Sequence, residues 1–288
     1  MWCNKTLGQW IYKVKISHSA KETYLECGYK YFLHYMLKLR SQDEKSPLIF
    51  GDAIDTGLNS LLSVKNLEIG KRDFLLKWDE AKKKSIKFSK SDYEEHLVPD
   101  VQGSDEEKAW ASLKEKGLII LEEYFEQIIP KIKKVEEVQL NKFIPNGHGD
   151  SLNIKTDFIC TWEDGRRILF DNKTSSVKYD DNAVKESKQL ATYYEMLKDD
   201  YKIDACGYIV VPKKINKKKR PRIEIKVIID NIPEETISAT FKEYDQVLHN
   251  VKTAQFIKNE QSCFSKYGKC TYYDYCHKND KTGLSEKD

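Results

Sequence analysis

The sequence predicts an α/β (α+β) fold in which helices flank a central mixed β-sheet. Helix-like segments open the chain of 288 residues, strand-like segments follow together, and a helix separates them from a later strand pair. Hydrophobic residues make up 40% of the chain and aromatic residues 11%, which suffices for a buried core. No linker is evident. We therefore expect one domain, 1–288, with a helical part (1–130), a sheet core (131–232) and a C-terminal helix with a tail (233–288).

The helices are predicted from capping residues and from apolar residues at helical spacing. Ser19 and Glu22 form a capping-box pattern before an aromatic-rich run that ends near Leu39. The other helices are expected at 50–64, across 70–130 with a break at 99–104, at about 182–198, and from about Pro233 onward.

A hairpin is predicted where strand-like residues flank the Asp-Gly of residues 163–165. A three-residue loop with a left-handed glycine pairs Asp157 with Asp171 and aromatic with aromatic residues, whereas a two-residue loop pairs polar with apolar ones. Only the first register gives matched neighbours, and it places Lys173 on the carboxylate face. The strands are expected at about 135–145, 152–162, 166–173, 205–212 and 222–229.

Charge and cysteine usage bear on the cellular location of the protein and do not identify a binding partner. The net charge of +3 is nearly balanced and does not by itself indicate nucleic acid binding. The chain has no apolar run of membrane-spanning length and no signal-peptide core, so we expect a cytoplasmic, reducing location. Seven cysteines in such a chain suggest a metal site and not a disulfide framework. The last ten or so residues, which are polar and charged, are expected to be disordered.

Asp157, Asp171 and Lys173 form the first constellation that fits a chemical role. Mg²⁺ and Mn²⁺ prefer hard oxygen ligands, so two carboxylates and a backbone carbonyl, here that of Asn172, are a sufficient set. Such a metal polarises a phosphate, and a neighbouring lysine orients the attacking water and stabilises developing charge. The alternative is a surface hairpin with solvated charges. The apolar residues 168–170 favour an interior strand.

Two helices carry further candidates. Gln189 and Tyr193 are four residues apart and share a face, from which they could reach the metal site or a nucleic-acid backbone. Taken alone, an ordinary polar flank of an amphipathic helix is the better interpretation. In the helix at 50–64, Gly51 could open the helix and allow close approach. Asp55 is a candidate metal ligand one turn further on, and Asp52 fits a favourable dipole interaction.

Three cysteines in the C-terminal tail predict a thiolate site. Cys263, Cys270 and Cys276 lie within fourteen residues, and Cys27 is the favoured fourth ligand. Thiolates suit zinc or an iron–sulfur cluster. The rival fourth ligands are His277 and Cys3. Free buried thiols are the alternative, which suits Cys160 and Cys206 in predicted strands.

A basic run lies between the last two predicted strands and fits a hairpin loop that follows a phosphate backbone. A solvated lysine-rich loop is the alternative. The residues of the run are Lys213, Lys214, Lys217, Lys218, Lys219, Arg220 and Arg222.

In order and spacing, these motifs resemble the RecB-like branch of the PD-(D/E)XK nuclease superfamily, specifically its iron–sulfur members. That group includes AddB-type nuclease domains, CRISPR-associated RecB-like exonucleases and many phage-encoded relatives. Asp157 resembles the first acidic motif, residues 171–175 (Asp-Asn-Lys-Thr-Ser) the Asp-x-Lys-Thr-Ser motif, and Gln189 with Tyr193 the Gln-x-x-x-Tyr motif.

The two ends of the chain extend the resemblance. Residues 19–35, with Cys27, look like the opening helix and the first cluster cysteine of the family. Gly51-x-x-x-Asp55 occupies the place of a Gly-x-x-x-His motif, with Asp in the usual His position. The last three cluster ligands correspond to Cys263, Cys270 and Cys276, and Tyr267 stands where the usual Cys-x₂-Cys-x₅-Cys pattern has its first cysteine.

The resemblance implies a restriction-endonuclease-like core with a helical cap, and a metal-dependent DNA exonuclease acting on single strands or duplex ends in replication, recombination or repair. It implies Mg²⁺ or Mn²⁺ held by Asp55, Asp157, Asp171 and Asn172, with Asp157, Asp171, Lys173, Gln189 and Tyr193 as catalytic residues. It also implies a [4Fe–4S] cluster on Cys27, Cys263, Cys270 and Cys276, with zinc as the alternative, and a helicase or recombination partner. The functional alternatives are an endonuclease of the same fold and a catalytically silent nucleic-acid-binding subunit.

Overall fold

The computed structural model describes residues 13–83, 85–94, 97–98, 101–147, 149–175, 178–212, 223–265 and 268–287. Contacts group the chain into two compact units, each assembled from segments that are separated in sequence. The sheet unit comprises Asp43–Leu140 and Lys155–Pro233. The cysteine unit comprises Met1–Gln42, Asn141–Ile154 and Glu234–Asp288. The expectation of one domain in three consecutive parts stays a prediction.

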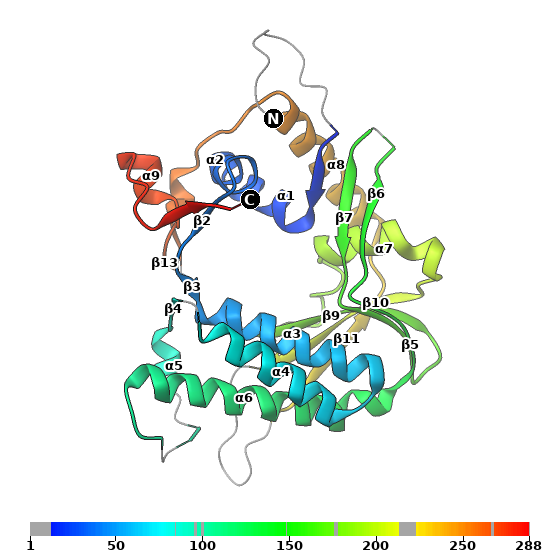
Figure 1. Ribbon diagram of the computed structural model, residues 1–288. Helices are drawn as coiled ribbons and strands as arrows, with labels where there is room; N and C mark the ends of the chain where they lie inside the picture. The colour runs from blue at the N-terminus through cyan, green and yellow to red at the C-terminus, as the bar shows by residue number, and fades with distance from the viewer. Residues whose placement is uncertain are drawn as a thin grey trace. The chain divides into compact units, whose positions relative to one another are not determined.

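The sheet unit is built on a five-stranded mixed sheet, as the sequence predicts (Figure 1). Its strand order is β11-β10-β9-β8-β5. Only the central pair β9–β10 is parallel, and the other pairs are antiparallel. A parallel pair needs a crossover, and α7 lies in the connection between the two strands. The strands are β5 (Ile132–Val138), β8 (Phe158–Trp162), β9 (Arg167–Ser175), β10 (Ala205–Pro212) and β11 (Lys226–Asp230).

The β8–β9 hairpin has the predicted three-residue register. Phe158 pairs with Phe170, and their rings stack with centroids 5.3 Å apart. Gly165 has a φ of +91°, the left-handed conformation that the loop requires and that glycine adopts without steric cost. The ladder ends one position before Asp157 and Asp171, so these two carboxylates continue the register beyond the last paired residues.

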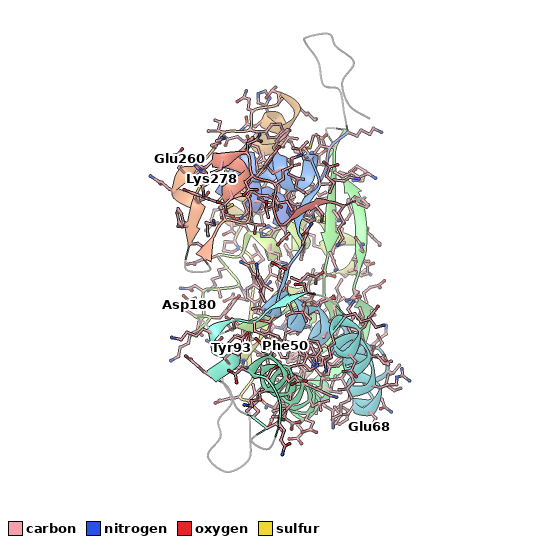
Figure 2. The ribbon with its side chains drawn as sticks, turned by 60° about the vertical axis from the view of Figure 1, so that its left-hand side comes forward. Phe50, Glu68, Tyr93, Asp180, Glu260 and Lys278 are labelled. Carbon is pink, nitrogen blue, oxygen red and sulfur yellow. The ribbon has the colours of Figure 1, made fainter. Side chains whose placement is uncertain are left out.

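Helices α3, α4 and α6 pack together and share one hydrophobic core with the sheet (Figure 1). Phe50, labelled in Figure 2, meets Trp78 edge to face, and Trp78 stacks on Trp110 at 4.0 Å. No helix among the described residues is long and apolar enough to cross a lipid bilayer. The helices of this unit are α3 (Ser46–Val64), α4 (Leu67–Ala81), α5 (Lys90–Glu94), α6 (Asp105–Gln127), α7 (Lys188–Tyr201) and the 3₁₀ turn Ile129–Lys131; β3 (Glu44–Lys45) pairs with β4 (Ile86–Lys87).

Several boundaries differ from expectation, including those of the strand expected at 135–145, which is divided between β5 and Asn141–Pro145. Helix α3 begins at Ser46 and has a proline in its first turn. Proline is tolerated there because a backbone N–H in the first turn has no acceptor within the helix. Gly51 therefore lies inside the helix and does not open it, and Asp52 pairs with Lys77 at 2.9 Å. The expected strand at 152–162 is two strands, β7 and β8, separated by Thr156 and Asp157.

The cysteine unit combines a small sheet, in the order β1-β7-β6, with short helices and paired strands. Helices α1 and α8 pack together, and buried Lys21 of α1 forms an ion pair with Glu243 of α8 at 2.7 Å. The strands are β1 (Lys15–Ser17), β2 (Leu39–Ser41), β6 (Asn141–Pro145), β7 (Ser151–Lys155), β12 (Phe264–Ser265), β13 (Gly268–Lys269) and β14 (Leu284–Glu286). The helices are α1 (His18–Glu26), α2 (Gly28–Tyr31), a π-helix (Phe32–Met36), α8 (Glu234–Lys252), a 3₁₀ turn (Glu260–Cys263) and α9 (Tyr273–Lys278).

The long first helix that the aromatic-rich run predicts is instead broken. Ser17, and not Ser19, caps α1 by accepting a hydrogen bond from the backbone N–H of Ala20. Cys27 has an extended backbone, with φ −163° and ψ 112°, so the helix ends there and α2 begins after it. The expected disorder at the C-terminus is also wrong for residues 284–286, which pair with β2 as β14.

Candidate active site

The central strand β9 carries two of the predicted site residues on one face. Asp171 and Lys173 are two positions apart and therefore project to the same side of the sheet. Asp171 is only 4% exposed. Asp157 precedes β8, and its Oδ2 accepts a hydrogen bond of 2.6 Å from the backbone N–H of Asn172. The hairpin thus brings both carboxylates and the lysine together.

Helix α7 adds a side chain that contacts both charges. The Nε2 of Gln189 donates to Asp171 Oδ1 at 2.9 Å, and its Oε1 accepts from Lys173 Nζ at 2.9 Å. The same Nε2 lies 3.1 Å from the hydroxyl of Tyr193, one turn further along the helix. Gln189 and Tyr193 therefore point into the site and are not a solvated flank of the helix.

Lys173 also forms an ion pair with Asp171, with Nζ 2.6 Å from Oδ2. The ammonium is therefore the charged partner of this buried carboxylate oxygen. Burial lowers the pKa of Lys173, but the Asp171 carboxylate outweighs it and the net pKa is raised. The ammonium group is therefore retained at neutral pH, and Lys173 is a cation in the site.

Three carboxyl groups in this site have raised pKa values. Burial is the largest cause for Asp157, followed by the charges of Asp171 and Asp55. Burial likewise raises the pKa of Asp171, against the pull of Lys173. For Asp55 on α3, partial burial and then the charge of Asp171 raise the pKa to about 6. Like charges in a low-dielectric setting disfavour ionisation. The three carboxyl groups therefore lack enough neighbouring positive charge for all of them to be ionised.

The donor set fits a divalent metal. All three carboxyl groups offer hard oxygens, and their raised pKa values show that the single Lys173 ammonium does not offset their mutual repulsion and burial. Asp55 is exposed to solvent, so an ion from solution can reach it. Among the residues that the structure describes, no three or more His, Cys, Asp or Glu side chains are already arranged as a metal site.

Asn172 offers the site its backbone and not its side chain. Its Oδ1 accepts a hydrogen bond of 3.0 Å from the hydroxyl of Tyr124 on α6, on the opposite face of the sheet from Asp171. Burial is the main cause that raises the pKa of Tyr124, so the phenol stays a neutral donor. Of the groups of Asn172, only the carbonyl that the sequence predicts as a ligand is left for a metal.

The cysteines that the sequence groups together lie in one region of the cysteine unit. Cys27 caps α2, and its Sγ accepts from the backbone N–H groups of Lys30 at 3.5 Å and Asn259 at 3.4 Å. The backbone N–H of Cys270 donates to the carbonyl of Cys263 at 2.8 Å across the β12–β13 hairpin. Cys276 lies on α9; Glu260 and Lys278, labelled in Figure 2, mark the ends of this tail segment.

The other three thiols affect the ionisation of Cys263. Burial raises the pKa of Cys263, and the neighbouring thiols Cys270, Cys276 and Cys27 raise it further. His277 is also close, with Nε2 3.6 Å from Cys263 Sγ. Among the described residues of this tail, no three or more cysteine, histidine or carboxylate side chains are arranged as a metal site, so a group bound by the four cysteines stays a prediction. Cys3, the other rival ligand, lies outside the described residues.

Comparison with known proteins decides the family. A model of the PD-(D/E)XK nuclease superfamily matches residues 15–277, a range that includes the acidic trio, Lys173, Gln189, Tyr193 and the four grouped cysteines. The chain belongs to the PD-(D/E)XK nuclease superfamily.

The fold of this PD-(D/E)XK nuclease is shared with a solved structure from Eubacterium rectale that is described as a "putative exonuclease". The TM-score is 0.54 at 13% identity, over 97% of this chain and 94% of that one, so the likeness shows the fold alone. A second structure, that of SSO0001, has 14% identity over 72% of this chain and 77% of its own. Its TM-score of 0.29 is too low to indicate a shared fold. A search of curated proteins found no match.

Sequence reasoning missed three groups of the nuclease site. Tyr208 on β10 lies beside Lys173, Ser187 precedes α7, and Tyr124 holds Asn172. Tyr208 could have been found only from the parallel pairing of β10 with β9, and the sequence does not show that pairing. The predicted basic run Lys213, Lys214, Lys217, Lys218, Lys219, Arg220 and Arg222 lies outside the described residues.

Proposed function

We propose that this PD-(D/E)XK nuclease is a divalent-metal-dependent DNA exonuclease that acts on single strands or duplex ends. The strongest support is the Gln189 amide, which contacts Asp171 and Lys173 at 2.9 Å each and so holds a carboxylate and an ammonium in one fixed arrangement. A buried ion pair that is merely structural has no need of two further carboxyl groups and an amide around it. Phosphodiester hydrolysis uses such a combination of metal ligands and a cation.

Each group has a role that follows from its chemistry. Asp55, Asp157 and Asp171 would hold Mg²⁺ or Mn²⁺, with the carbonyl of Asn172 as a further oxygen ligand. The bound ion would polarise the scissile phosphate and lower the pKa of the attacking water. Lys173 positions that water and stabilises the charge that develops on the phosphate, and Gln189 keeps its ammonium in place.

Tyr193 belongs to the same proposal as a support for substrate placement. Its hydroxyl contacts Gln189, and its ring is buried, so it adds a rigid phenol beside the reacting groups. DNA is the substrate class that the superfamily implies. Replication, recombination or repair with a helicase or recombination partner is the setting that we propose. A nearly neutral chain gains from a partner that delivers the strand.

We further propose that Cys27, Cys263, Cys270 and Cys276 hold a [4Fe–4S] cluster that is structural. Four thiolates are the usual ligand set of such a cluster, and they equally suit zinc, which is the alternative. His277 is the imidazole that a zinc site would favour over one of the thiolates. A reducing, cytoplasmic location keeps these thiols available. Iron and zinc analysis, together with the visible absorption spectrum of the purified protein, distinguishes the two.

The experiment that tests the function compares two DNA substrates of one sequence. End-labelled linear single-stranded DNA and a covalently closed single-stranded circle are incubated with wild type and Lys173→Ala, with Mg²⁺ and separately with Mn²⁺. We expect wild type to degrade the linear strand alone and Lys173→Ala to degrade neither. Cutting of the circle by wild type would replace the exonuclease by an endonuclease of the same fold.

A catalytically silent DNA-binding subunit is the second candidate, and one residue favours it. Asp55 stands where the Gly-x-x-x-His motif has histidine, so the metal shell here contains one more oxygen and one less nitrogen. Binding of both DNA forms without cleavage in either metal would support this candidate. Restoration of cleavage by Asp55→His would then identify Asp55 as the cause of the silence.

A further inference from the structure

A buried hydrogen bond joins the start of α7 to the strand next to the catalytic strand. The hydroxyls of Ser187 and Tyr208 lie 2.6 Å apart, and the two residues are 8% and 5% exposed. Ser187 also caps α7, because its Oγ accepts from the backbone N–H of Leu190 at 3.0 Å. One serine hydroxyl thus ties the first turn of α7 both to its own backbone and to β10.

Tyr208 is opposite the centre of the site in the sheet. In the parallel β9–β10 pair, Tyr208 is in register with Asp171. The ammonium of Lys173 lies 5.7 Å from the centroid of the Tyr208 ring, within the range of a cation–π interaction. Tyr179 packs on the same ring edge to face, with the ring centroids 5.3 Å apart.

The position of Gln189 depends on this connection. Gln189 is the second residue of α7, two positions after Ser187, and its amide is the group that joins Asp171 to Lys173. The first turn of a helix has backbone N–H groups without helical partners and frays readily unless a cap holds it. A displacement of about 1 Å at such a group is enough to impair catalysis strongly.

We propose that Tyr208 and Ser187 are positioning residues of the nuclease site. Their hydrogen bond fixes the first turn of α7 against β10, and this places the Gln189 amide between Asp171 and Lys173. The Tyr208 ring forms the wall against which the Lys173 ammonium rests. Neither residue touches the reacting phosphate in this scheme. The inference rests on the proposed function, because the alignment of Lys173 matters only if the site hydrolyses DNA.

Tyr208→Phe tests the hydroxyl and keeps the ring. We expect kcat on linear single-stranded DNA to fall about 3- to 10-fold, the equivalent of one neutral hydrogen bond, with KM unchanged. Tyr208→Leu, which also removes the wall beside Lys173, should lower kcat further. Tyr201→Phe is the matched control, because it removes a phenol hydroxyl that contacts Glu137 at the other end of α7. Equal kcat values for Tyr208→Phe and wild type would overturn the proposal.

A double-mutant cycle separates positioning from general stability. In a Gln189→Leu background, Tyr208→Phe should have no further effect on kcat, because its hydroxyl acts through Gln189. Independent, multiplying effects of the two substitutions would contradict the proposed route. The effect of Ser187→Ala should likewise not multiply with that of Tyr208→Phe on kcat, although it also removes the cap.

A readout without catalysis keeps the inference testable if wild type proves silent. The side-chain amide signals of Gln189 in a ¹H–¹⁵N spectrum are identified by their loss in Gln189→Leu. We expect Tyr208→Phe to shift or broaden these signals and Tyr201→Phe to leave them in place. Unchanged Gln189 signals in Tyr208→Phe would refute the positioning role, whereas absent cleavage by wild type would refute only the proposed function.

Discussion

At the scale of single residues, Asp171 shows how one side chain serves two partners. Its Oδ1 accepts a hydrogen bond from the Gln189 amide, while its Oδ2 forms an ion pair with the Lys173 ammonium at 2.6 Å. Two further carboxyl groups, of Asp157 and Asp55, raise the local negative charge. One lysine cannot balance three carboxylates. The electrostatics therefore favour a divalent cation in the site.

Lys173→Ala should abolish cleavage while folding and DNA binding remain nearly intact. The ammonium stabilises charge that develops in the transition state, and loss of such a group typically costs about 10²- to 10³-fold in kcat. Without the ammonium, Asp171 lies beside two other carboxyl groups, and its pKa rises further. These carboxyl groups can then be protonated and neutral, so we expect the fold to persist. Single-turnover cleavage and a DNA-binding isotherm measure the two properties.

Lys198→Ala is the control for that substitution. Lys198 is on the same unit, in α7, and pairs with Glu195 at 2.6 Å away from the acidic trio. Cleavage at the wild-type rate by Lys173→Ala would remove Lys173 from the mechanism.

The acidic trio should make stability depend on pH when no divalent metal is present. A carboxyl whose folded pKa is raised stabilises the fold below its unfolded pKa, and that contribution is lost as the pH rises through the folded pKa. For Asp55 the window runs from about 3.8 to about 6. We therefore expect Asp55→Asn to lose less stability than wild type between pH 4 and pH 7 in urea unfolding with EDTA.

Asp79→Asn, at an exposed position of α4, is the control for this pH dependence. It should follow wild type across the same range. Mg²⁺ should restore more stability to wild type at pH 7 than at pH 4, because the metal competes with protons for the same oxygens. A wild type and an Asp55→Asn variant with parallel pH curves would contradict the raised pKa.

At the scale of secondary-structure elements, the close contact of β9 with β10 depends on a glycine. A Cβ on Gly207 would lie 2.4 Å from the buried Phe170 ring and 3.0 Å from the carbonyl of Ile228. Phe170 precedes Asp171, so the same contact that packs the core also fixes the strand that carries the site. The packing of the Phe170 ring against Gly207 thus limits where the Asp171 carboxylate can lie.

Gly207→Ala should destabilise the protein by about 1–3 kcal/mol, because overpacking forces the Phe170 ring or the strand to move. Gly51→Ala is a control of opposite sign. A Cβ there meets nothing within 4 Å, and alanine inside a helix is more stable than glycine by about 0.5–1 kcal/mol. Urea unfolding of both variants measures the difference, and a stabilised Gly207→Ala would contradict the described contact.

At the scale of the whole molecule, the four cysteines join parts of the chain that are far apart in sequence. Cys27 follows α1, whereas the other three lie between Cys263 and Cys276. A group bound by all four would close a loop of nearly the entire chain. Closing a long loop restricts the unfolded chain, and binding to the folded state alone adds stability in proportion to affinity.

Cys270→Ala should therefore lower the melting temperature and bleach the colour that an iron–sulfur cluster gives. Cys206→Ala removes a thiol that is buried in β10 of the sheet unit and is not one of the four grouped cysteines, so it should keep the colour. Absorption near 400 nm and iron content measure the outcome. A colourless wild type that contains zinc would replace the cluster by the zinc alternative.

Much of the architecture could be predicted because its signals are local. The hairpin register was predicted by matching the residues that face one another on either side of a three-residue loop. The strand predicted at 205–212 agrees with β10 in both bounds. The broken first helix could not be predicted in this way. Its interruption at Cys27 depends on hydrogen bonds from Lys30 and from distant Asn259 to the sulfur, and these do not appear as a helix-breaking residue in the sequence.

The sequence by itself determined the mixed α/β class and the Asp157–Asp171–Lys173 face, because strand alternation and motif spacing are properties of neighbouring residues. Only the tertiary structure decided that Gln189 joins Asp171 to Lys173, that Asp55 of α3 adds to the same charge, and that Tyr208 lies beside Lys173. Those relations depend on helix packing and on the parallel pairing of β9 with β10. Contacts of this kind join residues far apart in sequence, and short-range patterns carry no record of them.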